Sequence, residues 1–409
     1  MFYKKYRGRK QQNNSLRVRH IAALFFITFF VQIAFSQSLT EQEAMDLAVK
    51  NHPLIQKNQT QILHAKALIP TAKTLAPAEF SAETPQFLMG PDNSTVWTVL
   101  GVQQSFLNKK VYQQHEKTLQ QQVKVSEAEL AVSVQDIRHQ ARVLYQNCLL
   151  TKEKIRYWQE QDSVFQAFNR VAEVEARVGK ITPLERLTIE SFYKNTAHLL
   201  RGAALENQNA LLALNQYLKT TQTVINQSFV KLFLEQKDRA TLPLQQFYVE
   251  NERLQTEKQA QQKLATTPSY NVGVNQYLFN RFVAPVVRVG VNVPLWTKGY
   301  KAAEQAAMIE IQVAQKERDV VDFQLNTAFQ KALNDVASAL QNLDFYEKTG
   351  LPQAIEILNA AQKTRALGAA TTFEYLQSLR QAFELKIGYL MALQGYNEAV
   401  LRLDYFKNL

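Results

Sequence analysis

Val99-Leu100-Gly101-Val102-Gln103-Gln104-Ser105-Phe106 aligns with Arg288-Val289-Gly290-Val291-Asn292-Val293-Pro294-Leu295, 189 residues further along the chain. The same separation relates Gly179, Thr182 and Glu185 to Gly368, Thr371 and Glu374. A register kept across separate anchors indicates that one ancestral half was duplicated, with a strand pair between long helices in each half. This pattern is typical of a pseudo-symmetric tube rather than of a globular enzyme.

Both aligned segments alternate apolar and polar residues, which is typical of a strand with one apolar face. The first strand pair is expected at Phe80 to Met89 and Val96 to Phe106, around the turn Gly90-Pro91-Asp92-Asn93-Ser94. In the second pair, Tyr270, Val272 and Val274 alternate with Asn271, Gly273 and Asn275. Its second strand is expected over Val287 to Leu295.

Long segments without a helix breaker follow each strand pair. Neither Gly nor Pro occurs from Val102 to Val178 or from Tyr300 to Thr349. Val123, Leu130, Ile137 and Leu144 recur every seven residues, a spacing typical of helices that wrap around partners. A helix from Lys109 to Val178 would extend about 105 Å at ~1.5 Å per residue. A plain fibrous coiled coil would explain these helices but not the four alternating strands.

Matching corners are expected to end the long helices. In both, a Gly ends one helix, and a Thr begins the next with a Glu three residues later as a capping box. The fold class is therefore mixed α and β, mostly α and internally duplicated. We expect a first repeat over residues 37–220, with a helical hairpin at 109–220, an irregular bridge at 221–242 and a second repeat over 243–409. The second repeat would hold strands near 269–296 and a hairpin at 298–406.

The net charge of +11 comes mostly from residues 1–36, which hold seven Lys and Arg and no acid. This basic block precedes the apolar run Ile21 to Phe35, shorter than the ~20 residues of a membrane-spanning helix. Residues 1–36 are therefore expected to be a secretory signal peptide, with an uncleaved signal anchor as the alternative. The only cysteine, Cys148, lies in a helical pattern and is expected to be buried.

The chain resembles the TolC-like outer-membrane efflux protein family. The resemblance rests on Leu39-Thr40-Glu41-Gln42-Glu43-Ala44 with Asn51-His52-Pro53, on Val289 to Trp296 followed by Gly299, and on the paired Gly-x-x-Thr corners. It implies a homotrimer in which each protomer gives four strands to one outer-membrane β-barrel. The helices would form an α-barrel across the periplasm, where a periplasmic adaptor (membrane fusion protein) and an inner-membrane transporter, expected to be of the RND type, dock.

The resemblance also assigns candidate sites. The corners would form the adaptor-docking tip, unless their Gly and Thr are only helix caps; the tip residues are Arg177, Gly179, Thr182, Glu185, Arg365, Gly368, Thr371 and Glu374. The polar strand faces would line the pore, unless they are the outer face of a soluble sheet; the candidates are Gly101, Gln103, Asn271, Gly273, Asn275, Arg288, Gly290 and Asn292.

Family members often narrow the periplasmic mouth with carboxylates and tyrosines before the second corner. Here Leu358 to Leu367 has neither, so an acidic gate cannot be carried over. We hypothesise instead that Glu173 or Glu175 meets Lys363 or Arg365 and helps to close the mouth.

No enzyme signature is present: the HExxH, CxxC, P-loop and Gly-x-Ser-x-Gly motifs are all absent, and the six histidines lack ligand-like spacing. We expect no catalytic residue, no metal site, no cofactor and no nucleic-acid partner. The function expected from the resemblance is a passive exit duct for small molecules or metal cations. The alternatives are an exit channel for type I protein secretion and a periplasmic coiled-coil structural protein without a channel.

Overall fold

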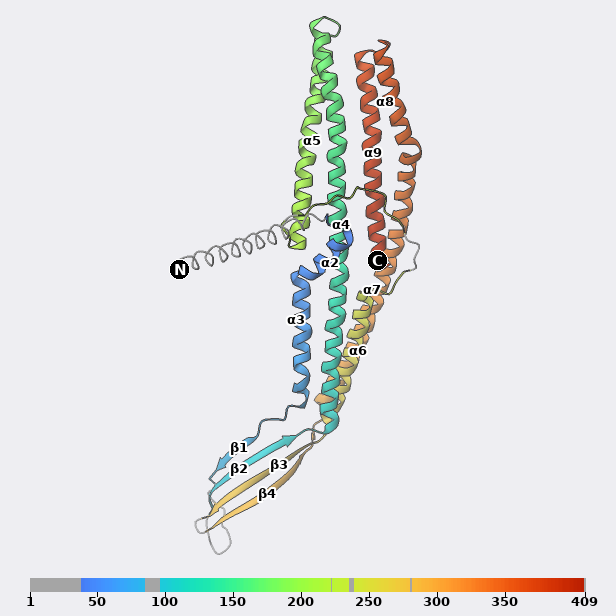
Figure 1. The fold of residues 1–409 in the computed structure, drawn as a ribbon. Coiled ribbons are helices and arrows are strands. Elements are labelled where there is room, and N and C mark those ends of the chain that lie inside the picture. The colour runs from blue at the N-terminus through green and yellow to red at the C-terminus, as the bar shows by residue number, and fades with distance from the viewer. Residues whose placement is uncertain (1–37, 85–95, 222, 235–238, 280–281, 408–409) are drawn as a thin grey trace, which may run out of the picture. The chain divides into compact units, whose positions relative to one another are not determined.

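The computed structural model describes residues 38–84, 96–221, 223–234, 239–279 and 282–407 (Figure 1). The expected signal peptide and the expected turn at 90–94 lie outside these residues. The elements, in chain order, are α2 (Glu41–Asn51), α3 (Pro53–Leu68), η1 (Ile69–Lys73), β1 (Glu79–Glu83), β2 (Val96–Phe106), α4 (Lys109–Arg177), α5 (Pro183–Leu218), α6 (Pro243–Lys263), η3 (Leu264–Thr266), β3 (Ser269–Phe279), β4 (Val283–Asn292), α7 (Lys298–Phe345), the π-helical turn η4 (Tyr346–Gly350), α8 (Leu351–Ala366) and α9 (Thr372–Tyr405).

The chain divides into two compact units, and each draws on both sequence halves. Unit 1 takes the described residues up to Ala48, with Ala141–Val230 and Ala354–Ile387. Unit 2 takes Val49–Gln140, Lys231–Gln353 and the described residues from Gly388. The described parts of the predicted bridge at 221–242 contain no helix or strand, as expected.

Aromatic side chains from three helices form much of the core of unit 1. Phe165 of α4 lies 6.0 Å between ring centroids from Phe192 of α5 and 6.0 Å from Phe383 of α9. The hydroxyl of Tyr157 donates a hydrogen bond to the backbone carbonyl of Phe383 at 2.8 Å. Because Tyr157, Phe165 and Phe383 are buried, the three helices are held together by apolar packing with one satisfied polar group.

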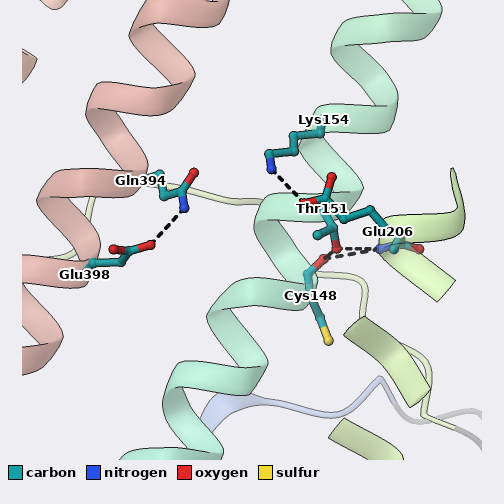
Figure 2. Close-up of polar contacts among 7 residues, drawn as sticks. Cys148, Thr151, Lys154, Glu206, Gln394 and Glu398 are labelled. Carbon is teal, nitrogen blue, oxygen red and sulfur yellow. Dashed lines mark hydrogen bonds and ion pairs between the residues drawn. The ribbon is translucent and has the colours of Figure 1, made fainter. Parts of the chain in front are cut away.

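Polar contacts add a second link between α4 and α5 in unit 1 (Figure 2). Lys154 of α4 forms an ion pair with Glu206 of α5 at 2.9 Å. Thr151 accepts a hydrogen bond from the amide of Asn207 at 2.9 Å and donates one to the carbonyl of Cys148 at 3.1 Å. Cys148 is buried, as predicted, and burial raises the pKa of its thiol to about 12. The thiol is therefore unreactive at neutral pH.

Unit 2 combines a four-stranded antiparallel sheet in the order β1-β2-β3-β4 with several helices. Its α3 packs on α4 through Ile62, Ala65 and Val123. Its α6 and α7 lie side by side (Figure 1) and are linked by an ion pair of 2.6 Å between Arg318 and Glu252. The heptad residues Val123 and Ile137 are buried, which agrees with the predicted packing seam of α4.

Three predicted boundaries need correction. The last strand is Val283–Asn292 and excludes Val293 to Leu295; Pro294 has no N–H for a strand ladder. The first strand begins at Glu79 rather than Phe80 and is described to Glu83; residues 85–89 of its expected span lie outside the described residues. The second long helix is not regular throughout, since η4 separates α7 from α8.

Candidate functional site

The eight predicted pore-lining residues lie on one face of the sheet. In the β2–β3 ladder, Gly101 faces Asn275 and Gln103 faces Gly273. In the β3–β4 ladder, Gly273 faces Arg288, Asn271 faces Gly290 and Ser269 faces Asn292. Because directly paired residues share a face and alternate residues return to it, Gln103, Asn271, Asn275, Arg288 and Asn292 lie on the same face.

Glycines on this polar face make room for the amide side chains of its neighbours. The Asn271 amide donates a hydrogen bond to the Asn292 side chain at 3.2 Å. A Cβ at Gly290 would lie 2.4 Å from Oδ1 of Asn271, and a Cβ at Gly101 would lie 2.9 Å from Oδ1 of Asn275. A side chain at Gly101 or Gly290 would therefore displace the amides of Asn275 or Asn271 from their present positions on the polar face.

Sequence reasoning missed the contribution of β1 to the polar face. Glu79 faces Gln103, Ser81 faces Gly101 and Glu83 faces Val99, so two carboxylates and a hydroxyl join this face. The signal was present, because Glu79, Ser81 and Glu83 alternate with Phe80 and Ala82. Of the three, only Glu79 lies outside the strand expected over Phe80 to Met89.

The opposite face of the sheet is apolar and exposed. One row of paired residues crosses all four strands, from Phe80 through Val102 and Val274 to Val287. The exposed fractions of Phe80 and Val287 are 77% and 70%, and the same face includes Val272, Val289 and Val291. A soluble protein rarely exposes so continuous an apolar surface, so a membrane or another protein is expected to cover it.

The sheet has two open edges. Within the described part of the chain, β1 pairs only with β2, and β4 pairs only with β3. Each outer edge therefore carries backbone N–H and C=O groups without a strand partner, which invites pairing with another strand.

The two corners have the same backbone geometry, as the repeat predicts. Gly179 and Gly368 have φ angles of 71° and 67°, in the left-handed region that favours glycine. After each glycine, a backbone N–H reaches back five residues, from Lys180 to Glu175 and from Ala369 to Thr364. Both long helices thus end in a Schellman motif, which satisfies the last carbonyls of the helix.

Matching capping boxes begin the returning helices. The Thr182 N–H donates to the Glu185 carboxylate at 2.7 Å, and the Glu185 N–H donates to the Thr182 hydroxyl at 3.2 Å. Thr371 and Glu374 form the same pair at 2.8 Å and 3.2 Å. The hydrogen bonds from the backbone and hydroxyl of the threonine lower the pKa of each glutamate. These four residues act as caps, whatever further role the corners have.

An ion pair joins the two hairpins next to the corners. Arg365 of α8 contacts the Glu175 carboxylate of α4 and also donates to the Thr372 hydroxyl at 3.3 Å. The structure therefore brings together one of the predicted gate pairs, Glu175 with Arg365. Glu173 accepts a hydrogen bond from Asn169 at 3.0 Å, and Lys363 takes no part in the contact. Arg177 is exposed beside Gly179.

None of the described helices has a stretch of the length and apolarity needed to cross a membrane. No group of three or more His, Cys, Asp or Glu side chains within residues 38–84, 96–221, 223–234, 239–279 and 282–407 gathers in a way that could hold a metal ion.

Comparison with known proteins gives matches in structure but not in sequence. No protein-family model matches the chain, and no curated protein matches it by sequence. The crystal structure of CusC, a protein that forms a transmembrane channel, matches with a TM-score of 0.74 and 14% identity. The match covers 90% of this chain and 94% of that chain. The CmeC outer-membrane channel of Campylobacter jejuni matches with a TM-score of 0.71 and 14% identity, over 91% of this chain and 89% of that chain.

The outer-membrane protein VceC of Vibrio cholerae matches with a TM-score of 0.71 and 11% identity, over 90% of this chain and 95% of that chain. These matches cover about nine tenths of the chain. They confirm the fold that the sequence motifs predict: the chain has the fold of the TolC-like outer-membrane channels.

Proposed function

We propose that this protein is the outer-membrane exit duct of a tripartite efflux system and works as a homotrimer. The observation that supports this most directly is the four-stranded sheet, with an exposed apolar face, a polar face and two open edges. Open edges are not tolerated in lipid, and four strands are too few to close a barrel alone. Three copies would pair the edges and make one closed cylinder, with the apolar faces in lipid and the polar faces around the lumen.

The duct would be passive, because energy would come from an inner-membrane transporter and a periplasmic adaptor would join the two. Its cargo would be small molecules or metal cations. In this assembly Gln103, Asn271, Asn275, Arg288 and Asn292 would line the barrel, and Glu79 and Glu83 would add negative charge to the lumen. The corners would form the periplasmic tip that the adaptor contacts.

Planar-bilayer recording of the purified protein tests the channel. We expect discrete conductance steps, and we expect the protein to remain with the outer membrane through alkaline and salt washes. A periplasmic structural protein would wash off and would not conduct. Secretion of polypeptides, the other candidate, would be recognised by the loss of an exported protein when the gene is deleted.

The contact between Arg365 and Glu175 is proposed to help keep the periplasmic mouth closed. Both side chains are 23% exposed, so the pair is partly shielded from water and is stronger than a fully exposed pair. Reversal of either charge, by Glu175→Arg or Arg365→Glu, should increase the open-channel conductance or the fraction of time spent open. The double reversal should restore the closed state, because it rebuilds the pair with opposite polarity.

Glu173→Arg is the matched control, because the Glu173 carboxylate accepts only a hydrogen bond from Asn169 on its own helix. If the Glu175→Arg and Arg365→Glu variants conduct like the wild type, or like Glu173→Arg, the ion pair does not act as a gate. The proposed channel function would be unaffected by that result.

A further inference from the structure

The charged side chains of the described sheet are confined to its two edge strands. Glu79 and Glu83 lie on β1 and Arg288 lies on β4, whereas the central strands β2 and β3 contain no charged residue. All three charged side chains are exposed, and all three lie on the polar face. One open edge of the sheet is therefore acidic and the other is basic.

These charges have no partner in their own subunit. Within the described part of the chain, none of the three side chains makes a hydrogen bond or an ion pair. Glu79 and Arg288 belong to one row of paired residues, which crosses the sheet through Gln103 and Gly273. Three strand spacings of about 4.8 Å separate them, whereas an ion pair needs about 4 Å or less. Each edge therefore presents its charge to whatever strand pairs with it.

The charges distinguish between the ways in which the edges of identical subunits can meet. Two β1 edges would bring glutamates together, and two β4 edges would bring arginines together. Like charges opposite each other destabilise a strand pair. Pairing of β4 with β1 of the next copy brings opposite charges together instead, and this head-to-tail contact is the kind that generates a closed ring.

Barrel geometry brings the opposite charges within reach at the seam, where β4 of one subunit meets β1 of the next. With twelve strands tilted by about 35–45°, the register across each seam shifts by about four to six residues from the row that joins Glu79 to Arg288. A shift of four keeps all five residues of β1 against β4, with Glu83 directly opposite Arg288 and Glu79 opposite Asn292. Side chains directly opposite each other have Cβ atoms about 4.5–5.5 Å apart, which allows an ion pair. A shift of two or six leaves a glutamate diagonal to Arg288, still within reach of long side chains.

We infer that Arg288 of each subunit forms an ion pair with Glu83 of the neighbouring subunit, on the luminal side of the seam. This inference rests on the proposed function, in which three sheets share one barrel, and it adds the residues and the charge chemistry by which the edges recognise each other. Glu79 lies on the same face of β1 and adds to the attraction. Because the pair faces water, its main effect is to favour unlike over like edges, with a modest gain in stability.

Exchange of subunits between trimers tests the inference. Full-length protein carrying a donor or an acceptor dye is purified in dodecyl maltoside, and exchange after mixing is followed by fluorescence energy transfer at low salt. Reversal of one edge, by Arg288→Glu or by the double variant E79R/E83R, should make exchange about tenfold faster, because repulsion replaces an exposed ion pair at each of three seams. The triple variant E79R/E83R/R288E should exchange like the wild type, because it rebuilds the pairs with opposite polarity.

Salt gives a second readout, which a general loss of folding would not change. At about 1 M salt the Debye length falls to ~3 Å, so the difference between the wild type and the one-edge variants should largely disappear. The matched control is Ser105→Glu, because Ser105 faces Asn271 on the polar face but lies on the central strand β2. This variant adds a carboxylate to the lumen away from the seam and should leave exchange unchanged.

The inference is overturned if the one-edge variants exchange at the wild-type rate at low salt, or if the triple variant exchanges as fast as they do. An effect that does not depend on salt, or an equal effect of Ser105→Glu, would overturn it as well. Planar-bilayer conductance of the same preparations separates this inference from the function on which it rests. Wild-type protein that conducts, with unchanged exchange in the variants, contradicts only the ion pair, whereas wild-type protein that is monomeric and does not conduct contradicts the proposed function and the inference with it.

Discussion

The two sequence halves form the same helix corners, but their long helices differ between the strands and the corners. Their corners match in φ angle, in Schellman hydrogen bonds and in capping boxes. Between strands and corner, however, the first half has one uninterrupted helix, Lys109–Arg177, whereas the second half has the π-helical turn η4 between α7 and α8. Conformation at the ends is set by a few residues with special backbone chemistry, which duplication preserved, whereas packing along the helices was free to diverge.

Tyr157 and Tyr346 occupy equivalent positions in the two halves, 189 residues apart. Their surroundings show how far the long helices have diverged. Tyr157 is buried in a regular helix, and its hydroxyl bonds the Phe383 carbonyl. Tyr346 begins η4, and its ring occupies the space where Gly388 and Gly350 would carry a Cβ. A π-turn adds a residue to one turn of the helix and shifts the faces that follow it. The same side chain thus fills two different environments.

The largest expected effect concerns the aromatic cluster around Phe165, which contacts Phe192 of the first half and Phe383 of the second half. Phe165 is 1% exposed, whereas the residue at the same separation in the second half is Ala354. Phe165→Ala should lower the free energy of unfolding by about 3–5 kcal/mol, because it leaves a cavity among Phe192 and Phe383. Denaturant unfolding followed by circular dichroism measures the change.

Phe373→Ala is the control for this variant, since Phe373 lies in the same unit and is 66% exposed. Comparable destabilisation by the two variants would mean that the aromatic cluster around Phe165 contributes no more to stability than an exposed phenylalanine does.

Glycine substitutions in α9 test the close approach at η4. A Cβ at Gly388 would lie 2.5 Å from the Tyr346 ring, so Gly388→Ala should cost about 1–3 kcal/mol in unfolding free energy through overpacking. Gly395 in the same helix has nothing within 4 Å of its Cβ position. Gly395→Ala should therefore stabilise the helix by about 0.5–1 kcal/mol. If the melting temperature shifts in the same direction for both variants, a tight contact between position 388 and Tyr346 is ruled out.

Removal of the two tyrosine hydroxyls compares the halves directly. Tyr157→Phe should cost about 1 kcal/mol in unfolding free energy, because the buried hydrogen bond from α4 to the Phe383 carbonyl of α9 is lost. Tyr346→Phe should cost less, since the Tyr346 hydroxyl has no hydrogen-bond partner among the described residues. The two variants would be compared in one denaturant series, and a larger loss at Tyr346 would contradict this assignment.

The smallest expected effect is a pH dependence of the corners. Hydrogen bonds from Thr182 and Thr371 lower the pKa of Glu185 and Glu374 from the usual 4.5. A carboxylate with a lowered pKa adds stability above its usual pKa, and this contribution is lost as the pH falls through the folded value. Stability measured below pH 4.5 should therefore fall less steeply in Glu185→Gln and Glu374→Gln than in the wild type. If the unfolding free energy depends on pH in the same way in the wild type and in both variants, the capping boxes do not contribute to the pH dependence.

Much of this architecture could be predicted from the sequence because its signals are local. A glycine with positive φ at a helix end, a Thr-x-x-Glu capping box and a period-2 strand each depend on a few adjacent residues. The contact between Glu175 and Arg365 was predicted as one of several pairings, and only the structure distinguishes it.

Other features depend on contacts far apart in the sequence. The π-turn η4 has no local breaker at Tyr346, and the space for its ring comes from Gly388 on another helix. Which face of α4 is buried near the first corner could not be predicted either. Val171, Val174 and Val178 look like any apolar stripe until the structure shows that the opposite face, with Phe165 and Phe168, is the buried one.

Closure of the sheet between subunits is the central claim, and disulfide cross-linking of the two edge strands tests it most directly. In one chain β1 and β4 lie at opposite edges of the sheet, so they cannot be bridged within a subunit. A cysteine at Ala82 of β1 would be combined in turn with cysteines at Val283, Val287, Val289 and Val291 of β4, which lie on the same apolar face of the sheet as Ala82. The buried Cys148, whose thiol pKa is raised to about 12, should not interfere.

At least one of these pairs should give covalently linked dimers and trimers under mild oxidation of the protein in the outer membrane. Folded protein that gives only monomers in every pairing would contradict a barrel shared between subunits.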